Sequence, residues 1–500
     1  MKTKRCFRRS AALFSVLFIL CAGVLFAEAG KGVSPSSGMY EEIEDYLFRR
    51  LGELRVPGAA LVVVEGDEIA HFAGFGKVGR GGEAPGLATP FVIESLTKSF
   101  TALAVMQLVD VGKVELDAPV QRYLPWFDLA DPAAAAKITV RMLVNQTSGF
   151  NQILGMIGLA DLETSWADAR EVHEQALAGF MPSRQPGEAY EYSNINFNLL
   201  GLIIEAVTGE SYGAYIENNV FTPLGMNHSY TDQAEARQNG LAEGHTFLFG
   251  LPKALPDLPL PEASLASGQL ISCPGDMARY MMAHVNGGEY AGGRILSPAG
   301  MEELFHPAVK AGAMGVDMGQ YAMGWFVEES QGSLRIWHDG FGPDFFSYMV
   351  LFPEEKRGML LLVNANHMFV NFPLLEVCEA ATDMLAGQRV EEASPGGLAK
   401  VTPVFLLIPL AQILGILYFA RRYRKRPVPY SKRALGILLA GLPHILLILA
   451  AAGLLISGMT AFSLLFLPDI TLVLLVCGGV SVVWFILRTW LIFRASGRAS

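Results

Sequence analysis

Residues 91–127 read FVIESLTKSFTALAVMQLVDVGKVELDAPVQRYLPWF, and the rest of the chain is interpreted from this stretch. Within it, Ser95 and Lys98 stand three residues apart at the start of a run with helical spacing of apolar residues. Side chains at this spacing share a helix face, so the Lys98 amine can reach the Ser95 hydroxyl. A hydroxyl becomes a nucleophile when a neighbouring base takes its proton, and a desolvated lysine is such a base. A helix N-terminus also favours a developing oxyanion. Taken alone, the pair is equally compatible with two ordinary solvated side chains.

A second short motif, Tyr192-Ser193-Asn194, precedes a helical pattern that begins near Phe197. A phenol can relay a proton if nearby cations lower its pKa, and an asparagine amide can hold a substrate amide or the lysine. The plainer interpretation is a turn that contains a buried tyrosine.

The third motif is His338-Asp339-Gly340, at the end of a strand predicted over Ser333–His338. An edge strand at this point offers backbone N–H groups to a substrate carbonyl, and Gly340 permits close approach. A structural histidine is the alternative.

Around these motifs the pattern changes from strands to helices and back. A helix is predicted over 39–54, a hairpin over Ala59–Val64 and Ile69–Phe75, and mostly helices from Ser95 to about Pro261. Strands return from Met323 onward, and four are predicted there: Gly324–Glu328, Ser333–His338, Phe346–Phe352 and Met359–Asn364. This order indicates an α/β domain whose single sheet uses both ends of the segment, with a helical insertion between them.

The order of the three motifs resembles that of the serine β-lactamase and penicillin-binding-protein family, especially its class C-like branch of esterases, D-aminopeptidases and carboxypeptidases. Residues 91–127 are similar to the family's nucleophile helix and following segment, and ITVRMLVNQTSGF at Ile138–Phe150 to its Thr-Ser-Gly segment. Pro186-Gly187 and ASGQLISCPGDMAR at Ala266–Arg279 also fit. The resemblance covers about residues 39–390 and implies an antiparallel sheet flanked by helices, with an all-helical insertion.

The resemblance also implies roles for the motif residues. Ser95 is the acylated nucleophile, Lys98 its proton partner, and Tyr192 the acid and base toward leaving group and water. The oxyanion hole is formed by the backbone N–H groups of Ser95 and Phe341, and Asn194 orients the substrate. No cofactor is implied.

Two positions depart from the family pattern. His338 occupies the place of the lysine in the family's Lys-Thr-Gly triplet, a replacement familiar in the esterase-like branch, and Asp339 puts a carboxylate beside it, ahead of Gly340. Gln146 stands where a histidine often precedes Thr-Ser-Gly. We expect His338, Asp339 and Gly340 to lie at the substrate-binding edge.

Composition excludes several classes. The 500-residue chain is 51% hydrophobic and 17% charged, against about 25% charged in a typical soluble protein. Its net charge is −10, and the acidic residues concentrate between the two basic ends. This charge would repel phosphate backbones, so nucleic acid is excluded as a partner. Five cysteines without a CxxC or HExxH pattern argue against a disulfide framework or a metal site.

The N-terminal residues 1–29 combine a basic segment, an apolar run and a small-residue triplet, the pattern of a signal peptide. Lipid attachment at Cys21 and an uncleaved anchor are the alternatives. At the other end, a short linker over 391–400 precedes a membrane segment over 401–494.

Within this segment three apolar runs, at 401–420, 434–456 and 470–487, are each long enough to span a bilayer. Lysines and arginines follow the first and third runs, while the loop before the third holds only Asp469. Because cytoplasmic loops collect basic residues, residues 39–390 are predicted to lie outside the cytoplasm, on a multi-pass protein of the cell membrane.

The leading interpretation is a membrane-anchored extracytoplasmic serine hydrolase that forms a covalent acyl-enzyme with an ester or amide. Its substrate would be a small ester or a cell-wall peptide-like molecule. The alternative is a catalytically idle ectodomain that serves as a binding or regulatory module. A transporter or channel is disfavoured, because His444 is the single ionisable residue inside the three runs. The sequence leaves the oligomeric state open.

Overall fold

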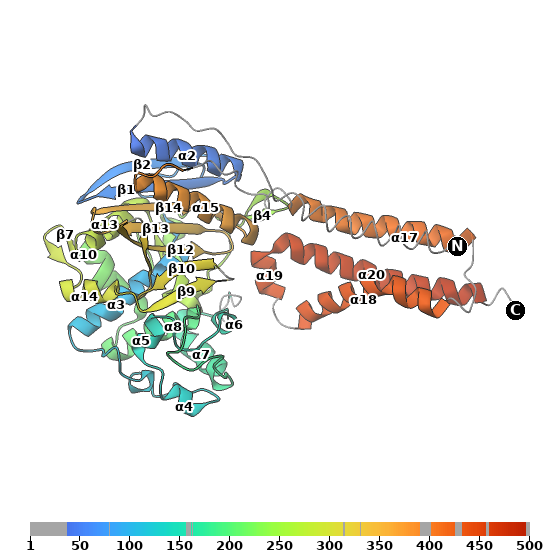
Figure 1. The fold of residues 1–500 in the computed structure, drawn as a ribbon, viewed down its shortest axis with the longest axis horizontal. Coiled ribbons are helices and arrows are strands. Elements are labelled where there is room, and N and C mark those ends of the chain that lie inside the picture. The colour runs from blue at the N-terminus through green and yellow to red at the C-terminus, as the bar shows by residue number, and fades with distance from the viewer. Residues whose placement is uncertain are drawn as a thin grey trace.

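The computed structural model describes residues 38–79, 81–156, 162, 164–313, 316–330, 332–390, 402–425, 433–456 and 460–496. The predicted signal peptide (1–29) and linker (391–400) lie outside the described residues. Figure 1 shows a rounded α/β part, from which the C-terminal helices lead away as a narrow arm.

One eight-stranded antiparallel sheet organises the rounded part. In spatial order its strands are β2 (Glu68–Gly76), β1 (Gly58–Glu65), β14 (Arg357–Val363), β13 (Phe346–Phe352), β12 (Ser333–Phe341), β11 (Phe326–Ser330), β10 (Val316–Tyr321) and β9 (Val309–Ala313). Strand β1 pairs with β14, with Ala59 opposite Val363 and Glu65 opposite Arg357. Both ends of the segment therefore contribute to one sheet, as the sequence pattern indicates.

Both faces of this sheet are buried, which explains why β1 reads as a nearly continuous apolar run. Ala60, Val62 and Val64 face one core, and the residues between them face the other. The first core also receives α3 (Thr97–Asp110), α8 (Asn194–Thr208) and α13 (Pro274–Val285), and the second receives α2 (Met39–Glu53) and α15 (Met368–Leu385). In Figure 1, α2 and α15 lie together above the sheet.

Shorter helices complete the insertion and its return to the sheet. They are α4 (Pro132–Ala135), α5 (Val140–Val144), α6 (Gln152–Gly155), α7 (Ala169–Ala178), α9 (Tyr212–Ile216), α10 (Thr222–Leu224), α11 (Gln233–Gln238), α12 (Leu265–Gly268) and α14 (Pro298–Leu304). The α/β fold with an antiparallel sheet and flanking helices is thus confirmed.

Two details of the sequence-based prediction are wrong. The hairpin β4 (His245–Leu248) and β5 (Leu251–Ala254) lies in the region expected to be mostly helical, where β4 pairs with β15 (Ala365–Asn366). The hairpin of β9 and β10 precedes Met323, where strands were expected to return. The pairing of β4 with β15 joins distant segments, whereas β9 and β10 form a local hairpin. In both cases strand pairing outweighs a weak local pattern.

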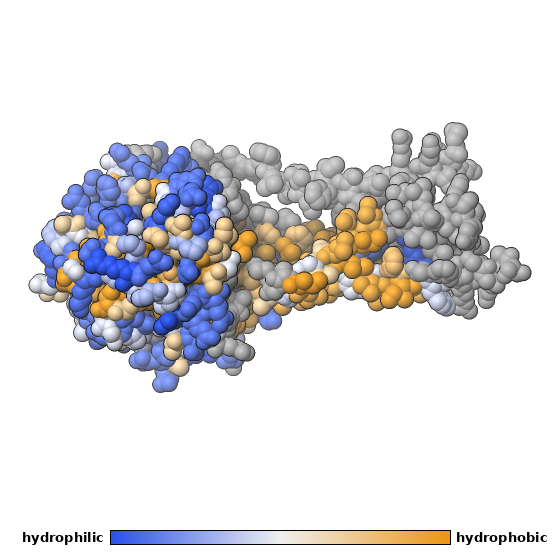
Figure 2. Space-filling view, turned by 90° about the horizontal axis from the view of Figure 1, so that it is seen from below, coloured by the Kyte–Doolittle hydropathy of each residue, from blue (hydrophilic) through white to orange (hydrophobic). Residues whose placement is uncertain are grey.

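The arm consists of a 3₁₀ turn and four helices among the described residues. They are η6 (Thr402–Leu406), α17 (Leu407–Lys425), α18 (Arg433–Ile456), α19 (Thr460–Phe466) and α20 (Pro468–Ser496). Figure 2 shows apolar residues covering much of its described surface, in contrast with the mixed surface of the rounded part.

Helix length and composition support fewer membrane spans than predicted. Pro468–Arg488, with a mean hydropathy of 2.6, is long and apolar enough to cross a membrane. His444–Ile456 and Thr460–Phe466 pass the same test only together, and they are bent by 103°. Val404–Tyr418 is a shorter apolar helix. One of the three predicted spans is therefore a candidate by these criteria, and the other two stay predictions.

Polar side chains connect three of the arm's helices. Gln412 Nε2 of α17 donates hydrogen bonds to Ser481 Oγ (2.7 Å) and to the Cys477 carbonyl (3.0 Å), both on α20. His444 Nδ1 of α18 lies 3.0 Å from the same Ser481 Oγ. Hydrogen bonds of this kind hold helices together in an apolar environment, so α17, α18 and α20 form one bundle.

Candidate active site

Ser95 lies at a sharp turn between a short strand and a long helix. The strand β3 (Phe91–Val92) pairs with β6 (Ile271–Ser272), and the chain then enters the 3₁₀ turn η1 (Glu94–Leu96), which runs directly into α3. Glu94 adopts φ = +52°, a left-handed conformation that is uncommon outside glycine. Such strained backbone persists where the surrounding structure enforces it, and here it lies next to the proposed nucleophile.

The three residues predicted to be catalytic meet at the Ser95 hydroxyl. Lys98 Nζ donates a hydrogen bond of 2.9 Å to Ser95 Oγ, and Tyr192 donates one of 2.8 Å to the same oxygen. Lys98 Nζ also donates to the Ser267 carbonyl at 2.5 Å and lies 4.8 Å from the centre of the Tyr192 ring. The residues come from α3, from the segment before α8 and from α12, so only the tertiary fold assembles the group.

Burial changes the proton affinities of both partners of Ser95. The Lys98 side chain is fully buried, and burial lowers its pKa to about 7, opposed by the neighbouring carboxyls of Glu94 and Asp339. A large fraction of Lys98 is therefore the neutral amine near neutral pH. Burial raises the pKa of Tyr192 well above its usual value, so this phenol keeps its proton. The structure does not give Tyr192 the cation-lowered pKa that its suggested relay role invoked.

Gln146 holds the Tyr192 segment in place. Its Oε1 accepts hydrogen bonds from the Ser193 backbone N–H (3.0 Å) and from Asn196 Nδ2 (2.5 Å), and its own carbonyl accepts one from Glu191 N–H (2.9 Å). Gln146 itself is fully buried, at φ = +58°. The residue noted in the sequence as a departure from the family pattern thus positions the chain on both sides of Tyr192.

Asn194 is the first residue of α8, which begins three residues before the predicted start near Phe197. Its Oδ1 is buried and has no hydrogen-bond partner among the described residues. Because a buried amide oxygen is normally paired, this atom is available to a substrate N–H.

The end of β12 lies alongside the Ser95 turn. Strand β12 is internal in the sheet, so the expectation of an edge strand is wrong for the strand as a whole. Its pairing with β11 stops at Trp337, however, and only β13 pairs with the following residues through Phe341. A Cβ on Gly340 would lie 2.7 Å from the Ile93 carbonyl oxygen and 2.8 Å from Glu94 Cβ. Only glycine permits this approach of β12 to the turn.

His338 and Asp339 have unequal surroundings. His338 is almost fully buried, and burial together with the Lys98 cation lowers its pKa to about 3, so the ring is neutral. Its Nδ1 donates to the Asp339 carbonyl at 2.5 Å, which leaves Nε2 as an acceptor; that atom is buried without a partner among the described residues. Burial raises the pKa of the Asp339 carboxyl to about 6, against the effect of Lys98.

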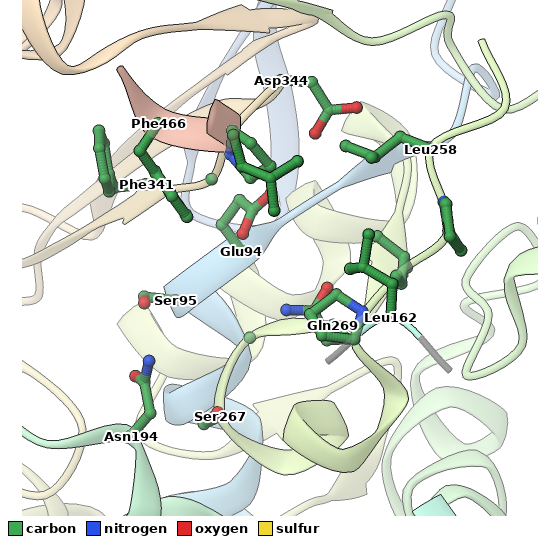
Figure 3. Close-up of a pocket in the computed structure, with 17 residues that line it drawn as sticks. Glu94, Ser95, Leu162, Asn194, Leu258, Ser267, Gln269, Phe341, Asp344 and Phe466 are labelled. Carbon is green, nitrogen blue, oxygen red and sulfur yellow. The ribbon is translucent and has the colours of Figure 1, made fainter. Parts of the chain in front are cut away.

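A pocket opens beside Ser95 and encloses about 530 Å³, part of it open to solvent. Ser95, Asn194 and Phe341 line it, whereas His338, Asp339 and Gly340 are not among its described lining residues. The sequence analysis missed several lining residues: Glu94, Asp344, Leu162, Leu258, Leu465 and Phe466. Figure 3 shows that they come from well-separated parts of the chain, which no local sequence pattern connects.

Comparison with known proteins agrees with this geometry. A family model described as Beta-lactamase matches residues 43–375. Protein flp of Staphylococcus aureus strain COL is 28% identical over 335 residues, which cover 66% of this chain and 64% of that protein. Penicillin-binding protein 4 of Amycolatopsis lactamdurans is 32% identical over 323 residues, 62% of this chain and 82% of that protein.

Among solved structures, the octameric penicillin-binding protein homologue from Pyrococcus abyssi is similar, with a TM-score of 0.60 and 26% identity. The match covers 70% of this chain and 78% of that one. The chain spans less than two thirds of the length of the Staphylococcus aureus relative. The family model matches residues of the rounded α/β part and none of the arm.

Proposed function

This chain belongs to the beta-lactamase family, and from that premise we propose that it is a membrane-anchored serine hydrolase that cleaves an ester or amide through an acyl-enzyme on Ser95. The observation that carries the proposal is the pair of hydrogen bonds that Lys98 and Tyr192 make to one oxygen, Ser95 Oγ. An idle relative has no need to keep a buried, fully desolvated lysine beside a serine hydroxyl.

Acylation begins when the neutral Lys98 amine accepts the Ser95 hydroxyl proton while Oγ bonds to the substrate carbonyl carbon. The oxyanion that forms is held by the backbone N–H groups of Ser95 and Phe341, two residues that line one pocket. The carbon–leaving-group bond then breaks. Tyr192 gives its proton to the departing oxygen or nitrogen and regains one from the Lys98 ammonium. No net charge accumulates on the three side chains.

Deacylation repeats these steps with water. The amine of Lys98, acting through Tyr192, removes a proton from the water as its oxygen attacks the acyl carbon, and Ser95 Oγ leaves with that proton. Asn194 supports the reaction by binding the acyl portion, since it lines the same pocket and its buried amide oxygen has no partner among the described residues.

We place the domain of residues 39–390 on the extracytoplasmic side, with three spans at 401–420, 434–456 and 470–487. The bundle formed by α17, α18 and α20 supports three spans that act as a unit. Asp469, in the loop predicted to be extracytoplasmic, lies against His367 of the catalytic domain, which agrees with both being on one side of the membrane.

The test is covalent labelling of the full chain in detergent with a fluorophosphonate probe, followed by assays with p-nitrophenyl esters, D-amino-acid amides, D-Ala-D-Ala peptides and nitrocefin. We expect one probe adduct per chain, on Ser95, and turnover of at least one substrate class. An unlabelled chain without turnover would favour the alternative, an ectodomain that binds without catalysis.

A further inference from the structure

The arm touches the catalytic domain at the pocket itself. Phe466, the last residue of α19, stacks on Phe341 of β12 with ring centroids 5.3 Å apart and an angle of 27° between the ring planes. Phe466 is 4% exposed, and its helix α19 lies at the end of the apolar arm that is next to the rounded part (Figure 1). Figure 3 shows the two rings side by side above Glu94 and Ser95. A residue from the membrane segment therefore packs on the strand that supplies the proposed oxyanion hole.

A hydrogen bond between two buried side chains fixes this contact. His367, just before α15, lies 3.2 Å through Nε2 from Asp469 Oδ1 at the start of α20, and each side chain is 1% exposed. His367 Nδ1 accepts a hydrogen bond from the Phe369 N–H, so the ring proton is on Nε2 and is donated to Asp469. Asp469 Oδ1 also accepts from the Ile470 N–H. Such a pair tolerates little displacement, because separation would leave both groups buried and unpaired.

Apolar side chains line much of the pocket beside Ser95. Leu465 and Phe466 of the arm are among them, as are Leu162, Leu258 and Leu260 of the catalytic domain. Asn194 and Phe341 line the pocket, whereas Tyr192, which would protonate the leaving group, is not among its described lining residues. We take this pocket to hold the acyl group, because Asn194, proposed above to bind the acyl portion, lines it.

Charge on the pocket wall disfavours an anionic acyl group. Glu94 and Asp344 both line the pocket, and both are almost fully buried. Burial raises the pKa of Glu94 well above its usual value and that of Asp344 to about 7. Near neutral pH the Asp344 carboxyl is partly uncharged, and a carboxyl that is charged on this wall repels a substrate carboxylate.

Accepting Ser95 as the nucleophile, as proposed above, we propose that the arm completes an acyl-binding subsite in which Leu465 and Phe466 contact an uncharged apolar acyl chain. The C-terminal helices then determine which substrates are cleaved, in addition to anchoring the domain. His367 and Asp469 are positioning residues, because their hydrogen bond holds Leu465 and Phe466 of the arm against Phe341.

The test compares p-nitrophenyl acetate with p-nitrophenyl hexanoate, using the full chain in one detergent. We expect the wild type to have the higher kcat/KM for hexanoate. Phe466→Ala and Leu465→Ala should each lower kcat/KM for hexanoate about tenfold, the effect of removing apolar contact from a substrate pocket. The value for acetate should fall several-fold less than the value for hexanoate, since acetate is too short to contact Leu465 and Phe466.

Leu464→Ala is the matched control, because Leu464 is the preceding leucine of α19 and is 40% exposed, outside the pocket lining. The Leu464→Ala variant should have the wild-type kcat/KM for both esters. Phe466→Leu should keep most of the preference for hexanoate, which separates loss of apolar contact from loss of folding. The proposal is overturned if Phe466→Ala lowers kcat/KM for both esters in equal proportion or lowers neither value. It is also overturned if the wild type has the higher kcat/KM for acetate.

The outcomes also separate this inference from the proposed function. A labelled, active wild type whose acyl preference ignores Phe466 refutes the subsite alone. A wild type with neither Ser95 labelling nor turnover refutes the hydrolase proposal, and the subsite with it.

Discussion

The amine of Lys98 lies 2.9 Å from the hydroxyl of Ser95, one helical turn away, in a position that excludes water completely. Desolvation gives the amine a pKa of about 7, and the Ser267 carbonyl fixes its direction. A lysine on the surface would be a cation that could not take a proton. The same side chain in this site is a base at neutral pH.

Replacement of Ser95 by alanine should abolish ester hydrolysis and leave the fold intact, because the small, partly exposed hydroxyl contributes little to the core. Loss of a covalent nucleophile costs about a thousandfold or more in kcat. The measurements are p-nitrophenyl ester turnover and thermal unfolding, with Ser333→Ala as a control far from the pocket. Retention of a tenth of the wild-type activity by the Ser95→Ala variant would exclude this residue as the nucleophile.

The pH dependence of kcat/KM should report the state of Lys98. Because the neutral amine is the base, activity should rise as pH increases through about 7 and then level off. Tyr192 keeps its proton throughout, since burial raises its pKa. The check is a pH profile from 5 to 9 with a neutral ester. A profile that falls through pH 7 would mean that the ammonium form of Lys98 is the active one.

Gly340→Ala should damage both stability and turnover. The added methyl group would meet the Ile93 carbonyl and Glu94 Cβ and push β12 away from the Ser95 turn. Overpacking of this kind costs about 1–3 kcal/mol. Gly52→Ala is the control, because nothing lies within 4 Å of its Cβ position in α2. We expect a lower Tm and a loss of activity for Gly340→Ala only, and equal Tm values for the two variants would contradict the close approach.

Substrate charge should matter through Asp339. Its carboxyl has a pKa of about 6 and is ionised at neutral pH, and the neighbouring His338 is neutral. We expect neutral or amine-bearing substrates to be preferred over matched carboxylates, and Asp339→Thr to reduce that preference about tenfold. The measurement is kcat/KM for an amide and free-acid pair at pH 7.5. A wild type that prefers the acid would refute this role of Asp339.

Membrane topology can be tested with protease-sensitive tags in intact cells. Tags after Arg424 and at Ser500 should be protected, while tags at Gly396 and Gly458 should be cleaved from outside. In the loop before the third predicted span, Gly458 is the insertion site rather than Asp469, because Asp469 is buried against His367. Cleavage of the tag at Ser500 from outside would show that one of the three predicted spans does not cross the membrane.

Residue patterns predict most of the sheet and the three residues around Ser95 Oγ. Strand β13 has the predicted bounds, since every residue of its Phe346–Phe352 run is buried. The order of three short motifs, together with their resemblance to a known family, points to Ser95, Lys98 and Tyr192, which meet at Ser95 Oγ. The β4–β5 hairpin escaped prediction because its pairing with β15 joins segments over a hundred residues apart. The place of Phe466 beside the pocket was not predicted for a related reason, because its partner Phe341 lies in a distant part of the chain.

The pairing of β1 with β14 also sets the order in which the protein can be assembled. Arg357 donates to Glu65 across 292 residues of sequence, so a chain that emerges N-terminus first has no central sheet until β14 has been made. Contacts of this sequence separation form slowly, and the apolar faces of β1 stay uncovered meanwhile. The stacking of Phe466 on Phe341 forms later still, because Phe466 is synthesised after β14. The proposed site, which β12 borders, is therefore among the last features to form as the chain is synthesised.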